Sequence, residues 1–199
     1  MLSLRNSLPN STEPNAAALL AARQCILDVG WRRTTLTDVA RRAGVSRMTI
    51  YRRWSDMQSL LADLMTLEWS GVFEDAAPDP GTPSLDRLAV AVSAMVTALR
   101  ENELFRKILH VDPELLLPYL LDRRGRTQDS ILALLEAAIG TGQREGSIRA
   151  GDPTLLARSL LLATHGFALS VETMADRSGP RVAAFDEELR ILIERYLKP

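Results

Sequence analysis

The sequence is short of the residues that build covalent or metal-bound scaffolds. Its 199 residues include one cysteine, Cys25, and two histidines, His110 and His165. A single cysteine excludes an internal disulfide and fits a reducing compartment. So few thiol and imidazole ligands also argue against a structural zinc site. We expect neither a metal nor a cofactor.

Aromatic residues and long apolar runs are scarce as well. Aromatics make up 5% of the chain and hydrophobic residues 46%, which favours Leu- and Ala-rich helices over a β-sheet core. No run approaches the roughly 20 apolar residues of a membrane span. Residues 1–14 lack the apolar stretch of a signal peptide. We therefore expect a cytoplasmic, all-α protein with a disordered N-terminal arm over residues 1–14.

Signatures of catalysis are missing from the sequence. It has no Gly-rich phosphate loop, no HExxH and no GxSxG. The closely spaced carboxylates, such as Glu187 beside Glu188, fall at expected helix starts, where capping and the helix dipole account for them. We do not expect an enzyme.

The chain as a whole has no large excess of positive or negative charge, but one segment of it has an excess of positive charge. The net charge of -1 excludes a uniformly basic nucleic-acid coat. Between Trp31 and Ser55, however, seven arginines face one acid, Asp38, a balance of +6 that leaves -7 for the remainder. The arginines are Arg32, Arg33, Arg41, Arg42, Arg47, Arg52 and Arg53. A bare cluster of this kind is more often a solvated face than a binding site, so the local structure has to decide.

Capping signals place these arginines on two short helices. Thr35 is a good N-cap, Asp38 three residues later completes a capping box, and Gly44 ends the first helix. Ser46 caps the second helix, which runs to about Trp54. Two short helices joined by a Gly-containing turn are the geometry of a helix-turn-helix, whose second helix enters the major groove of DNA.

A helical wheel divides the second helix into two faces. Ile50 and Trp54 share the sector expected to pack in the core, and Met48 and Arg52 point almost oppositely. Arg47 suits a bidentate contact with guanine, and the side chains of Met48 and Thr49 suit thymine methyls or base edges. Phosphate contacts are expected from Tyr51 and Arg53 and from the helix starts near Thr35 and Ser46.

The stretch TTLTDVARRAGVSRMTIYRRW resembles the helix-turn-helix of the TetR family of transcriptional regulators. The matching residues are Thr34-Thr35, Val39-Ala40, Ala43-Gly44-Val45-Ser46, Thr49-Ile50-Tyr51, Trp54 and Leu60-Leu61. The resemblance implies an all-α homodimer with an N-terminal three-helix DNA-binding domain and a C-terminal helical bundle. It also implies a small-molecule effector whose binding changes the spacing of the two DNA readers.

Two positions depart from the family pattern. The family usually has a small residue or proline where Met48 stands, and a lysine where Met57 stands. Met48 is therefore where we look for this protein's own base preference. The DNA-binding residues predicted together are Thr35, Thr37, Ser46, Arg47, Met48, Thr49, Tyr51, Arg52 and Arg53.

Periodicity along the chain predicts about nine helices in two functional domains. A DNA-binding domain is expected over 15–75, with its helix-turn-helix at 35–54, and an effector-binding and dimerisation domain over 84–199. The segment AAPDPGTP at 76–83 divides them. The long helices expected in the second domain include 84–100, 127 to about 139 or further, 154–174 and 184–197.

The resemblance places dimerisation on the last two helices, whose apolar faces are the most seam-like in the chain. The predicted interface residues are Leu155, Leu162, Gly166, Leu189, Leu192, Ile193 and Tyr196. Pocket candidates are chosen by region and by apolar or polar character. They are Met95, Leu99, Phe105, His110, Tyr119, Gln128, His165 and Phe167.

The resulting hypothesis is a dimeric repressor that binds a pseudo-palindromic operator in double-stranded DNA and is released by a small effector. Two alternatives remain open: an activator or global regulator on the same scaffold, and a helical dimer that binds a ligand or a protein without reading DNA sequence. The identities of the effector, the operator and the regulated genes are not encoded in any motif of the sequence.

Overall fold

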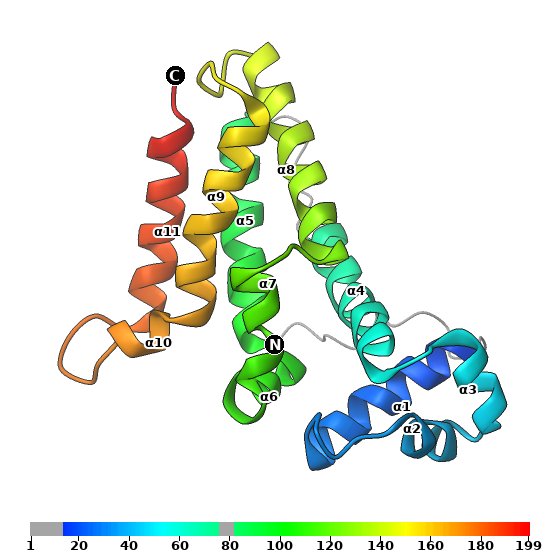
Figure 1. Ribbon diagram of the computed structural model, residues 1–199. Coiled ribbons are helices and arrows are strands. Elements are labelled where there is room, and N and C mark those ends of the chain that lie inside the picture. Colours follow the sequence, from blue (N-terminus) through cyan, green and yellow to red (C-terminus); the bar gives the residue numbers. More distant parts are fainter. Residues whose placement is uncertain (1–13, 76–81) are drawn as a thin grey trace. The chain divides into compact units, whose positions relative to one another are not determined.

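The structure is a computed structural model that describes residues 14–75 and 82–199 (Figure 1). Within these ranges the chain is helical and contains no strand, which confirms the all-α prediction. No helix there combines the length and apolarity that a membrane crossing needs. The predicted arm at 1–14 and the predicted break at 76–83 lie almost entirely outside the described residues.

The helices follow one another with short connections. In chain order they are α1 (Pro14–Val29), α2 (Leu36–Ala43), α3 (Arg47–Arg53), α4 (Met57–Asp75), α5 (Ser84–Glu101), α6 (Glu103–Val111), the 3-10 turn η1 (Pro113–Leu115), α7 (Leu117–Leu121), α8 (Arg126–Arg144), α9 (Pro153–Leu169), α10 (Val171–Met174) and α11 (Val182–Leu197). The short elements η1 and α10 bring the total in the described ranges above the nine or so helices predicted.

One of the long helices differs from its predicted limits. The helix predicted over 154–174 is divided at Ser170, whose φ of -122° and ψ of -3° leave the helical range. The N–H and the hydroxyl of Thr173 both donate to the Ser170 carbonyl, which starts the separate turn α10. Helix α8, whose predicted end is at about residue 139 or further, runs to Arg144.

The extension of α8 depends on a glycine. A Cβ built on Gly142 would lie 2.5 Å from Cδ1 of Ile148. Ile148 is buried in the core where the chain turns from α8 toward α9. Glycine is therefore required at this position for close packing against Ile148.

The chain divides into two compact units, each with its own core. The first unit holds the described residues up to Gly71 together with Asn102–Thr127, and the second holds Val72–Glu101 and Gln128–Pro199. Helices α6 and α7 thus belong with the N-terminal helices. The functional domains predicted at 15–75 and 84–199 stay a prediction.

The first unit is organised around α1, α2, α4 and α6. Its fully buried side chains include Ile26, Val39, Leu60, Leu64 and Leu104. The core is made of aliphatic residues from all four helices, with the ring of Trp54 packed among them. Helices α2 and α3 are fixed to this core, so the segment with the arginine cluster has a rigid support.

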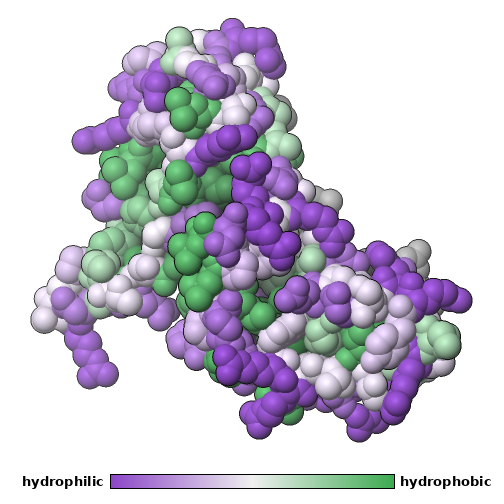
Figure 2. Space-filling model, in the orientation of Figure 1, coloured by the Kyte–Doolittle hydropathy of each residue, from purple (hydrophilic) through white to green (hydrophobic). Residues whose placement is uncertain are grey.

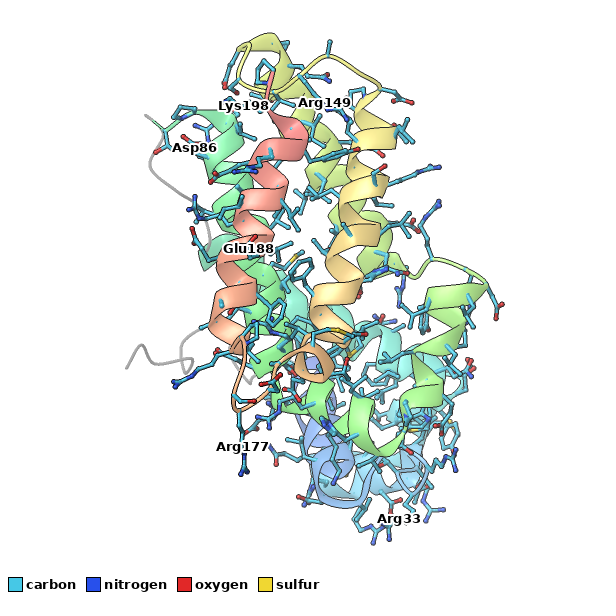
Figure 3. The ribbon with its side chains drawn as sticks, turned by 90° about the vertical axis from the view of Figure 1, so that its left-hand side faces the viewer. Arg33, Asp86, Arg149, Arg177, Glu188 and Lys198 are labelled. Atoms are coloured by element: carbon cyan, nitrogen blue, oxygen red, sulfur yellow. The ribbon has the colours of Figure 1, made fainter. Side chains whose placement is uncertain are left out.

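The second unit is built on α5, α9 and α11, which lie side by side (Figure 1). The backbone N–H of Arg149, just before α9, donates to the carbonyl of Leu197 at the end of α11 at 2.8 Å. Figure 3 shows Arg149 beside that end, near Lys198. The start of α9 therefore meets the end of α11, and the two helices run antiparallel.

Candidate nucleic-acid interface

The helix-turn-helix forms as its capping signals predict. The hydroxyl of Thr35 accepts from the backbone N–H of Asp38 at 3.2 Å, and the Asp38 carboxylate accepts from the N–H of Thr35 at 3.2 Å. Gly44 follows with a φ of 68°, which closes α2 in the left-handed region that favours glycine. Ser46 then caps α3 by accepting from the N–H of Thr49 at 3.1 Å. Each boundary is set by contacts within a few residues.

Helix α3 has one buried side and one exposed side. Ile50 is 1% exposed and Trp54 is 2% exposed, which confirms their predicted packing. On the other side Met48 is 76% exposed and Tyr51 52%. The Met48 side chain therefore contributes little to the core and is accessible to a partner.

Contacts within the chain separate the seven arginines. Four of them form ion pairs: Arg32 with Glu114, Arg41 with Asp38, Arg42 with Asp28 at 2.6 Å, and Arg53 with Asp63 at 3.0 Å. Arg33 donates to the backbone carbonyl of Val29 at 2.9 Å. Among the described residues, neither Arg47 nor Arg52 has an acceptor.

The pKa values of the paired groups follow from these ion pairs. The hydrogen bond from the Thr35 hydroxyl lowers the pKa of Asp38 against a smaller effect of burial, and the Arg41 charge lowers it further. The hydrogen bond with Asp28 raises the pKa of Arg42. These pairs are ionised together at neutral pH. Arg47 and Arg52, on the exposed side of α3, therefore carry charges that no carboxylate among the described residues balances, as does Arg33, which binds only a backbone carbonyl.

The remaining predicted DNA-binding residues lie on the same segment. Thr35 and Ser46 are exposed, and Thr37 and Thr49 are partly buried. The hydroxyl of Thr49 lies 2.9 Å from that of Ser46, so the two form one polar group at the start of α3. The structure thus brings all nine predicted residues onto α2, α3 and their caps, within the first unit.

Two carboxylates that the sequence reading did not select support this segment. Asp112 is 2% exposed and accepts from the backbone N–H of Trp31 at 2.9 Å, at the turn that leads into α2. Asp63 on α4 binds Arg53 and the indole N–H of Trp54. No local motif marks either residue, because the partners of Asp63 belong to another helix and its cap, and Trp31 lies 81 positions before Asp112.

The structure narrows the predicted dimer surface. Four apolar side chains on α9 and α11 are exposed: Leu155 (62%), Leu162 (71%), Leu192 (52%) and Tyr196 (37%). Gly166 on α9 is exposed as well. Figure 2 shows hydrophobic residues gathered over these two helices. Leu189 and Ile193 require correction: each is 1% exposed and packed in the core of the second unit, so neither is available to a partner.

The predicted pocket residues are divided between the two units. Phe105, His110 and Tyr119 belong to the first unit, and Met95, Leu99, Gln128, His165 and Phe167 to the second. Met95 and Phe105 are buried. His110 is exposed, and its Nδ1 lies 2.7 Å from the carbonyl of Arg106, within its own helix. Burial lowers the pKa of His165, which is partly buried on α9.

Comparison with known proteins agrees with the helix-turn-helix geometry. Residues 18–64 match the model of the bacterial regulatory proteins, tetR family. The chain is 35% identical over 200 residues to an HTH-type transcriptional regulator of Mycobacterium bovis, with 99% of this chain and 100% of the relative covered. The HTH-type transcriptional repressor BepR of Brucella suis is 25% identical over 171 residues, 82% of each chain.

Similarity of fold extends over nearly the whole chain. The TetR family repressor AlkX from Dietzia sp. superposes with a TM-score of 0.64 over 94% of this chain and 97% of its own, at 18% identity. At that identity the likeness concerns the fold alone. Together with the full-length relative, these matches show that the chain belongs to the tetR family of bacterial regulatory proteins and is an HTH-type transcriptional regulator.

Proposed function

We propose that this regulator is a homodimeric repressor that binds a pseudo-palindromic operator and is released by a small, largely apolar effector. The observation that carries the proposal is the pair of arginines on α3, Arg47 and Arg52, which have no acceptor among the described residues. An exposed helix with two uncompensated guanidinium groups fits the phosphates and guanine edges of a major groove. It would act in the cytoplasm, where the chromosome is accessible.

The chemistry of the exposed side chains assigns roles within the groove. Arg47, at the start of α3, fits a guanine, whose O6 and N7 accept two hydrogen bonds from one guanidinium group. The exposed thioether of Met48 fits a thymine methyl, the apolar group that the major groove offers. Tyr51, Arg52 and Arg53, further along α3, fit phosphates and would set the position of the helix.

Homodimerisation is supported by the exposed apolar side chains of α9 and α11. Leu155, Leu162, Leu192 and Tyr196 lie on two antiparallel helices, are exposed in the single chain and stand outside the core of the second unit. Two copies that bury these helices against each other would form a two-fold interface of the four-helix type. A two-fold dimer reads two half-sites of inverted sequence, which is the basis for a pseudo-palindromic operator.

The effector site is proposed among the second-unit residues of the predicted set. Phe167 and Leu99 pack against an aliphatic core there. His165 is partly buried, and no described residue forms a hydrogen bond with its imidazole. Such a group in an apolar setting fits a ligand that is mainly apolar with one polar atom. The names of BepR and AlkX as repressors support the sign of regulation proposed for this chain.

Selection from a random duplex library tests the proposal directly. The full-length protein should enrich an inverted repeat, and binding should weaken with salt at a log–log slope of roughly -0.9 per phosphate neutralised. An Arg47→Ala, Arg52→Ala double variant should enrich nothing. Failure of the wild-type protein to enrich an inverted repeat would sink the proposal and favour a helical dimer that does not read DNA. A reporter gene behind the selected site then separates repression from activation.

A further inference from the structure

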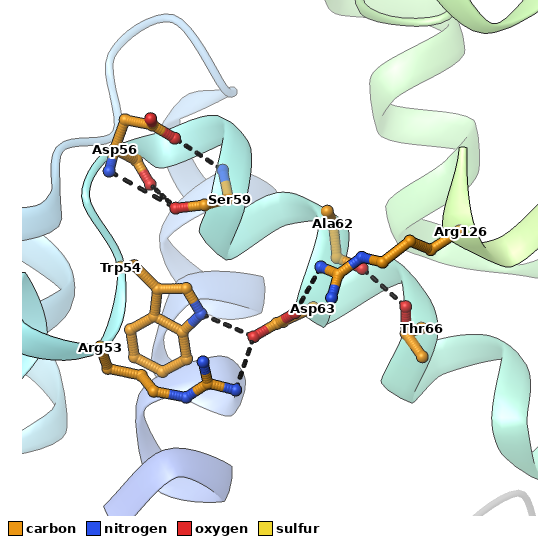
Figure 4. Close-up of polar contacts among 8 residues, drawn as sticks. All are labelled: Arg53, Trp54, Asp56, Ser59, Ala62, Asp63, Thr66 and Arg126. Atoms are coloured by element: carbon orange, nitrogen blue, oxygen red, sulfur yellow. Dashed lines mark hydrogen bonds and ion pairs between the residues drawn. The ribbon is translucent and has the colours of Figure 1, made fainter. Parts of the chain in front are cut away.

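Asp63 connects the end of α3, through Arg53 and Trp54, with Arg126 at the start of α8 (Figure 4). Its Oδ2 accepts from the indole Nε1 of Trp54 at 2.9 Å and lies 3.0 Å from Nη2 of Arg53. Its Oδ1 accepts from Nη2 of Arg126 at 2.6 Å. The Asp63 side chain is only 15% exposed, so solvent screens these contacts incompletely.

The contacts on Oδ2 fix one end of α3. Trp54 is the C-cap of that helix and is 2% exposed, so its indole N–H needs an acceptor inside the protein. Asp63 supplies it. The guanidinium Cζ of Arg53 lies 5.5 Å from the centre of the Trp54 ring, which places the cation beside the same carboxylate.

The contact on Oδ1 comes from the first residue of another long helix. Arg126 begins α8, which continues into the second unit. One negative charge therefore faces two guanidinium groups. A carboxylate shared in this way cannot neutralise both cations, and Arg53, whose side chain is 54% exposed, retains positive charge toward solvent.

The Asp63 carboxyl stays ionised although it is largely buried. Burial raises the pKa of the carboxyl, but the hydrogen bonds from Trp54 and Arg126 and the charges of Arg126 and Arg53 outweigh it, so the pKa falls below its ordinary value. The network is thus ionic at neutral pH.

We propose that Asp63 is a positioning residue for DNA binding and that Arg126 tunes it by competing with Arg53 for the carboxylate. With Arg126 in place, Arg53 is oriented by Asp63 but held loosely enough to bind a phosphate. Without Arg126, Asp63 binds Arg53 alone and removes its charge from DNA. The inference rests on the proposed function, because it takes Arg53 to be a phosphate contact. A shift of the first turn of α8 would change DNA affinity through this carboxylate.

Four substitutions in the full-length protein, alone and combined, test the competition. Arg126→Ala should weaken binding to a generic duplex of random sequence, and to the selected operator, by about threefold to fivefold, the scale of a partly exposed ion pair. The log–log salt slope should become shallower by up to roughly 0.9, because one phosphate contact is lost. Arg123→Ala is the matched control, since Arg123 also carries one positive charge near α8 but stacks on Tyr119.

The decisive comparison is Arg126→Ala in an Asp63→Asn background. Asparagine keeps an oxygen that accepts from Trp54 but carries no charge for the arginines to share. In this background Arg126→Ala should have no greater effect than Arg123→Ala. The same should hold in an Arg53→Ala background, which leaves Asp63 and Trp54 intact and serves if Asp63→Asn proves unstable. Equal losses from Arg126→Ala in all backgrounds would overturn the proposal, because Arg126 would then bind DNA itself or act through the fold.

The two proposals fail in different ways in this experiment. If the wild-type protein binds neither duplex, the DNA-binding function fails, and the positioning role falls with it. If the wild-type protein binds and the losses are simply additive, only the competition for Asp63 is wrong. Thermal unfolding of every variant checks that the fold is kept. The melting temperatures should not follow the changes in salt slope.

Discussion

The carboxylate of Asp112 accepts a hydrogen bond from the backbone N–H of Trp31, 81 positions earlier in the sequence, at 2.9 Å. It joins the end of α6 to the turn between α1 and α2. The turn is shaped to admit this contact: Gly30 has a φ of 84°, and a Cβ there would lie 3.3 Å from Oδ2 of Asp112. The approach of α6 thus fixes the entry to the helix-turn-helix.

Replacing Asp112 tests how much this contact stabilises the first unit. Asp112→Ala leaves the Trp31 N–H without its acceptor and should lower the free energy of unfolding by about 1–3 kcal/mol. Asp112→Asn keeps an acceptor oxygen and should cost less. Urea denaturation followed by circular dichroism measures both. Equal losses in the two variants would mean that the charge of Asp112 near Arg32, rather than the hydrogen bond, matters most.

One arginine without an acceptor and one arginine in an ion pair provide a matched pair of variants. Arg47→Ala removes a guanidinium group that has no acceptor among the described residues, and should weaken operator binding by about 1–3 kcal/mol if it reads a guanine. Arg42→Ala removes the same charge from a residue already paired with Asp28, and should have a much smaller effect. Fluorescence anisotropy with the selected operator measures both. Similar losses would show that total charge, not the free guanidinium, controls binding.

Local signals predicted the helix-turn-helix well because its boundaries depend on neighbours. Thr35, Ser46 and Gly44 act on residues within five positions, so their roles can be read from the sequence. Asp63 and Asp112 could not be found this way. Asp63 binds Arg126, 63 positions away, and Asp112 binds Trp31, 81 positions away. Packing decides such contacts, and no pattern in one sequence encodes them.

Periodicity also could not divide the apolar face of the last helix. Leu189, Leu192, Ile193 and Tyr196 form one broad stripe on a helical wheel, and the sequence reading assigned all of it to the dimer interface. In the structure Leu189 and Ile193 pack in their own core, and Leu192 and Tyr196 remain exposed. An apolar stripe this wide can pack against the core along one edge and remain exposed along the other. Only the fold shows which residues lie on each edge.

Two glycines of α8 should respond oppositely to alanine. At Gly142 a Cβ would lie 2.5 Å from buried Ile148, so Gly142→Ala should be destabilising: overpacking costs about 1–3 kcal/mol, more than helix propensity returns. At Gly140 the nearest atom is the flexible end of Arg144, at 3.6 Å. Gly140→Ala should therefore stabilise by up to about 1 kcal/mol. Thermal unfolding compares them, and a stabilised Gly142→Ala would show that Ile148 can move aside.

His165 should make stability depend on pH. Burial lowers its pKa in the folded protein, so as pH falls the unfolded chain takes up the proton first, near the ordinary value of 6.5. The contribution of neutral His165 is thus complete above that value and is lost as pH falls through the folded pKa. Melting temperatures between pH 8 and 5 should fall less in His165→Gln than in the wild type. His110→Gln, which alters the exposed histidine, should keep the full dependence.

Charged residues on α9 and α11 should separate the proposed dimer. Leu162 and Leu192 are 71% and 52% exposed in the single chain, so Leu162→Glu and Leu192→Glu should not disturb its core. In a dimer interface each would bury an unpaired carboxylate, whose desolvation exceeds the about 1.5–3 kcal/mol that a buried leucine contributes.

Light scattering should give twice the chain mass of 22.0 kDa for the wild type and the single-chain mass for both variants. Leu134→Glu is the control, because Leu134 is similarly exposed (51%) but lies on α8. The monomers should bind a full operator poorly while keeping their affinity for an isolated half-site, since each retains its own α3. A doubled mass in both variants would place the interface elsewhere. A monomer in the Leu134→Glu control would extend the interface to α8.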